Sequence, residues 1–182
     1  MQPQEFAEGL RRATPSLEKM RAAGESQFAI DYWSRKYQAF PRDTPLRIPA
    51  GVNKDDPVIS LISNWDLSQI EVGDFTFSAE IKRSQYGVLV GHDESAPIYL
   101  SPSDGSLMER EPGIESHILC QVAKNSGAYL DVMYEYATCI ARRVLEKDNP
   151  NEEEERERVA ARCIELAGGE EYTTFCRGLF GI

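Results

Sequence analysis

The central part of this chain constrains its fold most, because short apolar runs follow one another there with turn signals between them. The predicted strands are residues 75–81, 86–91, 98–100 and 106–110. The first is apolar at every second position, which predicts a strand buried on one face: Phe75, Phe77, Ala79 and Ile81. Polar turns are predicted at residues 92–97 and 101–105. Strands joined this closely pair antiparallel, so the sequence predicts a meander of about four or more strands.

Helical periodicity precedes the meander. Residues 1–40 predict three short helices, the second starting at Thr14-Pro15 and the third at Ser26. The third carries a stripe predicted to face the core: Ile30, Trp33, Tyr37 and Phe40. Four prolines between residues 41 and 57 predict a helix-free linker with a short extended piece at residues 46–48. The apolar run at residues 58–62 fits either a helix turn or a strand.

The last third of the chain is also helical in pattern. Asn125 and Ser126 are both suitable N-caps for a long helix with an apolar stripe over about 20 residues. A second helix is predicted to start at a cap on Asn151 and to end at Gly168-Gly169. The glutamates at residues 152–155 then lie at the positive end of its dipole. A short C-terminal segment is predicted to dock back onto the body.

These patterns predict an α+β fold: an antiparallel meander sheet flanked by N-terminal helices and a long C-terminal helix pair. The 182 residues suit one domain, which we expect to cover residues 1–182. Residues 1–45 form a helical N-terminal extension in this prediction, and residues 150–182 a helical C-terminal one.

Composition narrows the function. Thirty acidic against twenty basic residues give a net charge of −10, which weighs against nucleic acid and anionic membranes as partners and suits a basic protein partner. No stretch approaches the length of a membrane span, and the first residues lack a secretory signal pattern. The four cysteines form no C-x-x-C pair, so we expect free thiols, a reducing cytoplasm and no metal.

No catalytic constellation stands out. His92 is followed by Asp93, but neighbours on an extended chain point to opposite sides, and no nucleophile elbow or phosphate loop is present. His117 and Cys120 are three residues apart, a spacing that brings side chains together on a helical turn. Nearby glutamates would raise the pKa of that thiol, so we interpret Cys120 as a buried structural residue. We therefore expect a protein that is not an enzyme and needs no cofactor.

One stretch resembles a known family. Residues 86–93 (YGVLVGHD), 97–100 (PIYL) and 103–107 (SDGSL) resemble the central strands of the SUKH superfamily. Residues 122–130 (VAKNSGAYL) resemble the start of its long helix, with Gly127 in place of a usual serine and Tyr129 in place of phenylalanine. The resemblance covers about residues 58–145, and the usual N-terminal helix ending of the family is not evident.

The resemblance implies a binding protein, because many bacterial members are immunity proteins that neutralise a toxin, often a nuclease or deaminase, by direct contact. An acidic inhibitor suits a toxin with a basic active site. The predicted partner-binding residues are the carboxylates around the meander turns: Asp93, Glu94, Asp104, Glu109 and Glu111. Two alternatives stay open: a small hydrolase or transferase using carboxylates with His92 or His117, and an adaptor subunit docking through the Trp33 and Tyr37 stripe or the acidic helix.

Overall fold

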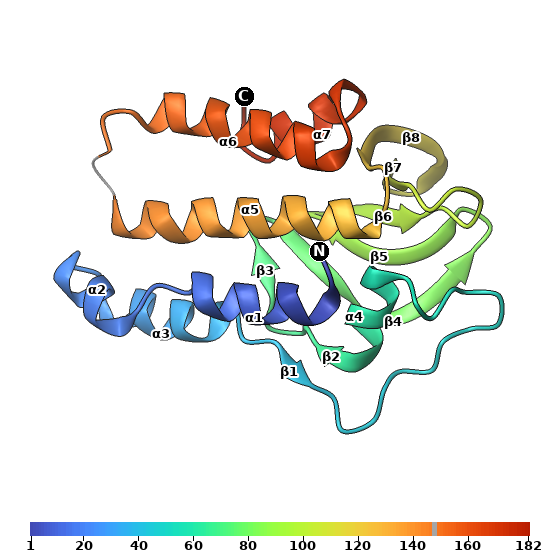
Figure 1. Cartoon of the computed structure of the whole chain (residues 1–182), viewed down its shortest axis with the longest axis horizontal. Coiled ribbons are helices and arrows are strands. Elements are labelled where there is room, and N and C mark those ends of the chain that lie inside the picture. Colours follow the sequence, from blue (N-terminus) through green and yellow to red (C-terminus); the bar gives the residue numbers. More distant parts are fainter. Residues whose placement is uncertain (147–148) are drawn as a thin grey trace.

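A computed structural model of the chain describes residues 1–146 and 149–182. In these residues a six-stranded antiparallel sheet is covered on one face by helices (Figure 1). The N-terminal elements are α1 (Pro3–Ala13), α2 (Leu17–Ala22), α3 (Gln27–Lys36), β1 (Phe40–Pro41), α4 (Pro57–Asn64) and β2 (Trp65–Asp66). The sheet consists of β3 (Glu71–Val72), β4 (Phe75–Ser84), β5 (Gly87–Asp93), β6 (Ala96–Leu100), β7 (Leu107–Glu111) and β8 (Ile114–Ala123). The C-terminal elements are α5 (Ser126–Leu145), α6 (Glu152–Ala167), η1 (Glu170–Tyr172) and α7 (Thr173–Gly178). The predicted α+β class and the flanking helices are confirmed.

The sheet follows chain order, β3-β4-β5-β6-β7-β8, so every neighbour in it is also a neighbour in sequence. This confirms the meander and extends it by an edge strand at each side. The helical-turn interpretation of His117 and Cys120 is wrong, because both lie in β8, where an odd spacing puts regular neighbours on opposite faces. The sequence of β8 does not show the alternation typical of a strand, because much of this strand is exposed. Its exposed apolar residues are Ile114, Ile118 and Leu119.

Bulges interrupt the predicted alternation in β4 and β5. The pairing of these strands shifts register between Phe77 and Lys82. Ser78 is buried there and its hydroxyl donates to the Glu80 carbonyl at 2.6 Å, whereas Ala79 is exposed. The prediction that Ala79 faces the core is therefore wrong, although Ile81 is buried as expected. An irregularity of this kind adds residues to one strand of a pair and increases the local twist.

The structure contains the three predicted N-terminal helices, but one of their predicted starting points differs. Ser26 caps α3 by accepting from the Ala29 N–H at 3.2 Å, as predicted. The predicted cap at Thr14 is wrong: Thr14 ends α1, and Ser16 caps α2 through the Lys19 N–H at 3.2 Å.

The aromatic stripe of α3 largely faces the core. Ile30, Trp33 and Tyr37 are buried, but Phe40 lies in β1 and is 57% exposed, which corrects its predicted place in the stripe. Trp33 and Tyr37 pack edge to face, and the Tyr37 hydroxyl donates to the Ala137 carbonyl of α5 at 3.3 Å. An adaptor function that docks a partner on this stripe is therefore not supported, because the stripe is already covered.

The ambiguous run at residues 58–62 lies in a helix. Asp56 caps α4, its Oδ1 accepting from the N–H groups of Val58 and Ile59 at 3.0 and 3.2 Å. Pro57 occupies the first turn, where a proline has no N–H bond to lose, so the prediction that this proline breaks a helix is wrong. The predicted extended piece at residues 46–48 lies in irregular chain.

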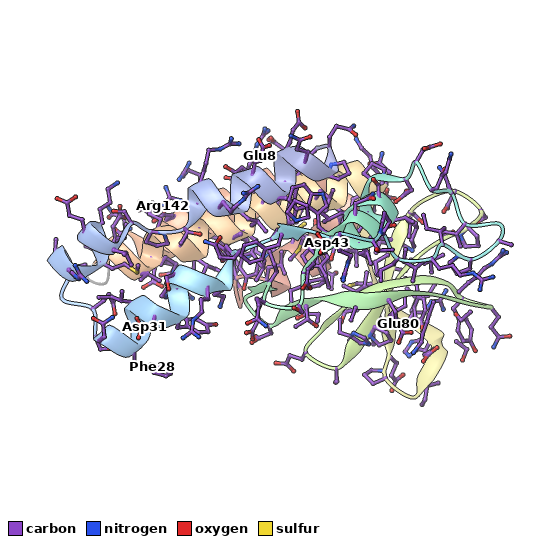
Figure 2. All side chains as sticks on the ribbon, turned by 90° about the horizontal axis from the view of Figure 1, so that it is seen from below. Glu8, Phe28, Asp31, Asp43, Glu80 and Arg142 are labelled. Atoms are coloured by element: carbon purple, nitrogen blue, oxygen red, sulfur yellow. The ribbon has the colours of Figure 1, made fainter. Side chains whose placement is uncertain are left out.

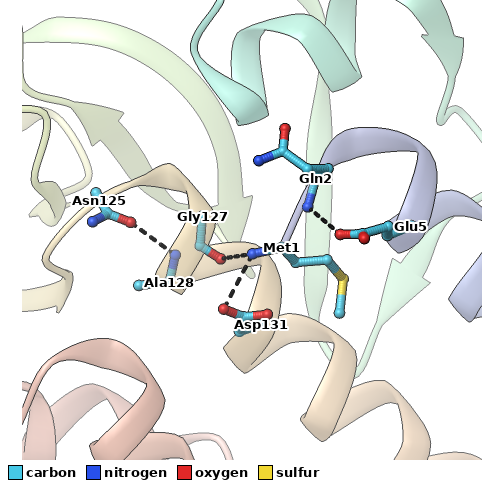
Figure 3. A network of polar contacts seen from close by, with 7 residues as sticks. All are labelled: Met1, Gln2, Glu5, Asn125, Gly127, Ala128 and Asp131. Carbon is cyan, nitrogen blue, oxygen red and sulfur yellow. Dashed lines mark hydrogen bonds and ion pairs between the residues drawn. The ribbon is translucent and has the colours of Figure 1, made fainter.

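The long helix α5 starts where the sequence predicts. The Asn125 Oδ1 accepts from the Ala128 N–H at 2.9 Å, as expected for an N-cap (Figure 3). The Met1 ammonium lies against the same first turn, donating to the Gly127 carbonyl at 3.1 Å and pairing with Asp131 at 3.2 Å. These contacts fix the beginning of α1 to α5.

The second C-terminal helix, α6, begins after Asn151, whose side chain makes no capping bond. The glutamates in its first turn lie at the positive end of the helix dipole, and two of them also pair with arginines of α5. Glu155 pairs with Arg142 of α5 at 2.6 Å, and Glu152 pairs with Arg143, so the acidic run also ties the two helices together. Gly168 and Gly169 end α6 with φ of 135° and 127°, which only glycine adopts easily.

One hydrophobic cluster runs through the described residues, from Phe6 in α1 to Phe180 after α7. Phe75 of β4 lies near its centre, with its ring against those of Phe77, Tyr129 and Phe175. Both predicted helical extensions thus contribute to the same core. None of the described helices combines the length and the hydrophobicity that a membrane-spanning helix requires.

Candidate functional site

The candidate site is built on the helix-facing side of the sheet, at the end that holds the β5–β6 turn. Asp93 lies directly opposite Phe75, and Glu109 lies opposite Ile98 on one side and Cys120 on the other. Directly paired side chains share a face of the sheet. Because Phe75 and Ile98 are buried under the helices, Asp93 and Glu109 point to the same covered face.

Two neighbouring turns bring further carboxylates to this end. The Glu94 N–H donates to the Asp74 carbonyl at 3.0 Å, which joins the β5–β6 turn to the β3–β4 turn. Glu94 has a φ of 47°, the one non-glycine residue in the left-handed region among the residues described. We call the group Asp74, Asp93, Glu94 and Glu109 the acidic end of the sheet.

The acidic end is under electrostatic strain. Burial, followed by the charges of Glu109, Asp74 and Glu94, raises the pKa of Asp93 to about 6. Burial also raises the pKa of Glu109, although the Cys120 thiol donates to its Oε2 at 3.1 Å and works in the opposite direction. Within residues 1–146 and 149–182, no lysine or arginine forms an ion pair with any of these four carboxylates. Half-buried charge without a counter-ion is costly, since solvent screens it poorly.

Two tyrosines of α5, Tyr129 and Tyr136, lie near enough to the acidic end to be affected by its charges. The Tyr129 hydroxyl is fully buried and has no hydrogen-bond partner among the described residues. Burial raises the pKa of Tyr129, and the Asp93 charge raises it further. Burial, followed by the Asp74 and Asp93 charges, raises the pKa of Tyr136 to about 12. Both phenols therefore stay neutral beside the carboxylates.

Of the other two predicted site residues, Glu111 lies at this end of the sheet and Asp104 lies at the opposite end. Glu111, at the end of β7, is hydrogen bonded to the His117 Nδ1 at 2.7 Å. Asp104 lies in the β6–β7 loop, at the opposite end of the meander from the β5–β6 turn. There its Oδ1 accepts from the Ser106 N–H and hydroxyl at 3.1 and 2.9 Å. The five predicted partner-binding carboxylates around the meander turns thus do not form one group. Asp104 is separated from the others because the loops at the two ends of a strand lie at opposite ends of the sheet.

The remaining candidate groups lie at separate places in the fold. His92 lies opposite Thr76, on the sheet face away from Asp93. Cys120 is partly exposed rather than buried, but burial and the Glu109 carboxylate raise its pKa, as predicted in direction. The other cysteines, Cys139, Cys163 and Cys176, are buried free thiols. Across the described residues no cluster of three or more histidine, cysteine or carboxylate side chains is arranged to hold a metal ion.

Sequence reasoning missed Asp74, Tyr129 and Tyr136. Asp74 follows Gly73 directly before the alternating stretch, which is a turn signal that marks its position. The tyrosines carry no such signal, because their importance depends on how α5 crosses the sheet.

A search against family models, curated proteins and solved structures found no match to this chain. The acidic end is therefore interpreted from its own geometry and charge.

Proposed function

We propose that this protein is a non-enzymatic binding domain that holds a basic protein partner against the acidic end of its sheet. The observation that carries the proposal is the group of four carboxylates at the acidic end, none of them neutralised by a lysine or arginine in the residues described. A cationic surface would supply the missing counter-charge and relieve the repulsion that, in addition to burial, raises the pKa of Asp93.

The SUKH resemblance suggests which kind of partner this would be, namely a toxin. An immunity protein neutralises a cognate toxin by direct contact in the cytoplasm, and a nuclease or deaminase toxin has a basic site because it binds phosphates. Carboxylates exposed on a turn, such as Glu94, suit this role because they speed the encounter with a cationic cleft. Half-buried Asp93 and Glu109 would contribute to holding the complex together.

The proposal is tested by co-expression with the product of an adjacent gene that has a nuclease-like C-terminal region. Wild-type protein is expected to restore growth, whereas Glu94→Lys is expected to abolish protection because it reverses one charge of the acidic end. The matched control is Glu18→Lys, the same reversal at an exposed site on α2. Protection that survives Glu94→Lys combined with Asp93→Lys would contradict the proposal.

The same proteins test the electrostatic basis directly. Affinity for the purified toxin is expected to fall steeply as sodium chloride is raised from low to high concentration, and the slope should be shallower for Glu94→Lys. An affinity that does not depend on salt would show that another surface binds. His92→Ala with His117→Ala serves as a further control, since a histidine-based enzyme would lose protection and a binding protein would keep it.

A further inference from the structure

A cavity of about 350 Å³ lies between α3 and the segment that leads into the sheet. One wall is a single face of α3, since Phe28, Tyr32 and Lys36 follow one another at four-residue steps. The other wall is formed by residues 68–71 and by Thr76. We call it the α3 cavity. Its wall includes the β3–β4 hairpin whose turn carries Asp74, but it shares no lining residue with the acidic end and does not depend on the proposed function.

Lys36 is the unusual member of this wall. Its side chain is nine-tenths buried, yet no carboxylate lies within ion-pair distance of it among the described residues. Its Nζ donates to the Tyr32 hydroxyl at 2.6 Å and lies 4.8 and 5.1 Å from the ring centres of Tyr32 and Trp33. The rings stabilise the ammonium in part, but two of its three N–H donors have no acceptor in the described residues.

A buried ammonium without a counter-ion is expensive, since buried charges in proteins are normally paired. Two acidic residues, Asp31 and Glu71, also line the cavity, but neither pairs with Lys36 in the described residues. The Asp31 carboxylate is exposed and accepts from the Gln27 side chain at 2.8 Å. Arg35, also in the wall, donates through Nε to the backbone carbonyl of Asp31 and forms no ion pair in the described part of the chain. The cavity therefore presents two cationic side chains without a contacting counter-ion, beside the exposed carboxylates of Asp31 and Glu71.

The mouth of the cavity is apolar. Phe28 is 83% exposed and projects from α3 away from the body of the molecule, and Tyr32 is 40% exposed (Figure 2). An aromatic ring placed here would cover apolar surface that water now covers, while its anionic group could reach the unused donors of Lys36.

We propose that the α3 cavity binds a small aromatic anion, a carboxylate or phosphate carried on a ring, with its charge at Lys36 and its ring against Phe28 and Tyr32. The probes are sodium benzoate and phenyl phosphate, titrated into the full chain by isothermal calorimetry. At least one should bind saturably, with a Kd below about 1 mM. Benzyl alcohol, which lacks the charge, and inorganic phosphate, which lacks the ring, should each bind at least about tenfold more weakly.

Two variants locate the site. Lys36→Met keeps most of the length of the side chain and removes its charge, so it should weaken binding at least about tenfold. Lys19→Met makes the same change at an exposed lysine of α2 and should leave the affinity unchanged. Phe28→Ser alters an exposed side chain that the fold does not need, and it should weaken binding about fivefold without a change in Tm. If Lys36→Met fails to fold, Phe28→Ser decides the test.

The proposal is overturned if neither probe binds saturably, or if a folded Lys36→Met protein binds as the wild type does. Equal binding of benzyl alcohol would overturn the assignment of Lys36 as the anion contact. The ratio of the benzoate and phenyl phosphate affinities then identifies the preferred anionic group.

Discussion

At the scale of single residues, Asp93 carries the clearest energetic consequence. Its pKa rises from 3.8 in the unfolded chain to about 6 in the fold, so the folded state holds its proton more tightly. The stability gained from this proton is complete below pH 3.8 and is lost as the pH rises through 6. Above that pH the carboxylate is charged in both states, and the fold bears the cost of burying it.

Asp93→Asn should therefore stabilise the protein at pH 8 and have little effect at pH 4. The expected gain is about 1 kcal/mol, a value reduced from the full shift because the side chain is partly exposed to screening solvent. Urea unfolding at both pH values measures it. A variant that is equally destabilised at the two pH values would mean that the charge of Asp93 is not the source of strain.

Asp104→Ala is a control for which we expect the opposite dependence of stability on pH. Hydrogen bonds from the Ser106 N–H and from neighbouring serine hydroxyls lower the pKa of Asp104. Its contribution is therefore present above pH 3.8 and is lost as the pH falls through its lowered folded value. This variant should be less stable than the wild type near pH 7, with the difference shrinking in acid.

At the scale of elements, Asp56 joins the starts of two helices. Its Oδ1 caps α4, and its Oδ2 accepts from the buried Ser126 hydroxyl of α5 at 2.8 Å. Asp56→Ala should cost about 2 kcal/mol, since it removes a cap and leaves Ser126 without its partner. The control Asp55→Ala changes an exposed neighbour and should be nearly neutral.

A double-mutant cycle separates the two roles of Asp56. If the Oδ2 contact couples the helices, Asp56→Ala and Ser126→Ala should show an interaction energy of about 1 kcal/mol in urea unfolding. Strict additivity of the two changes would mean that Asp56 acts on α4 alone.

The turn at residues 101–105 and the helix caps at Ser26 and Asn125 were predicted well from the sequence, because each depends on a few adjacent residues. β8 was missed because an exposed edge strand lacks a buried face to impose alternation. The bulge that buries Ser78 was missed because register depends on the partner strand.

The candidate site was predictable only in part, for a related reason. Asp93, Glu94 and Glu109 could be named because carboxylates next to turns lie near sheet ends. Asp104 was grouped with them because sequence distance does not show at which end of the sheet a loop lies. The unpaired Tyr129 hydroxyl and the buried Lys36 ammonium arise from contacts between distant segments, which a single sequence does not display.

At the scale of the whole molecule, α7 is part of the common core. Phe175 is 3% exposed and packs edge to face with Phe75, 6.4 Å between ring centres. Phe175→Ala should destabilise the entire protein by about 3–5 kcal/mol. Because both tryptophans lie in the first 65 residues, their fluorescence reports on the side of the chain that precedes the sheet.

The test compares two thermal unfolding curves of Phe175→Ala. Tryptophan fluorescence and far-ultraviolet circular dichroism should give the same lowered Tm, as in a single cooperative transition. A fluorescence transition left at the wild-type temperature would mean that α6 and α7 unfold as a separate unit.

Because the carboxylate of Asp93 is half-buried, binding of the proposed partner would exchange protons with the buffer. Near pH 6 this group is about half protonated, and a cation placed beside it would favour the charged form. Complex formation should then release up to about half a proton per molecule. The apparent binding enthalpy at pH 6 would vary with the ionisation heat of the buffer, and this variation should vanish at pH 8 and in Asp93→Asn. Calorimetry in two buffers would thus measure the number of protons released on binding, and a larger number would indicate that the partner lies closer to Asp93.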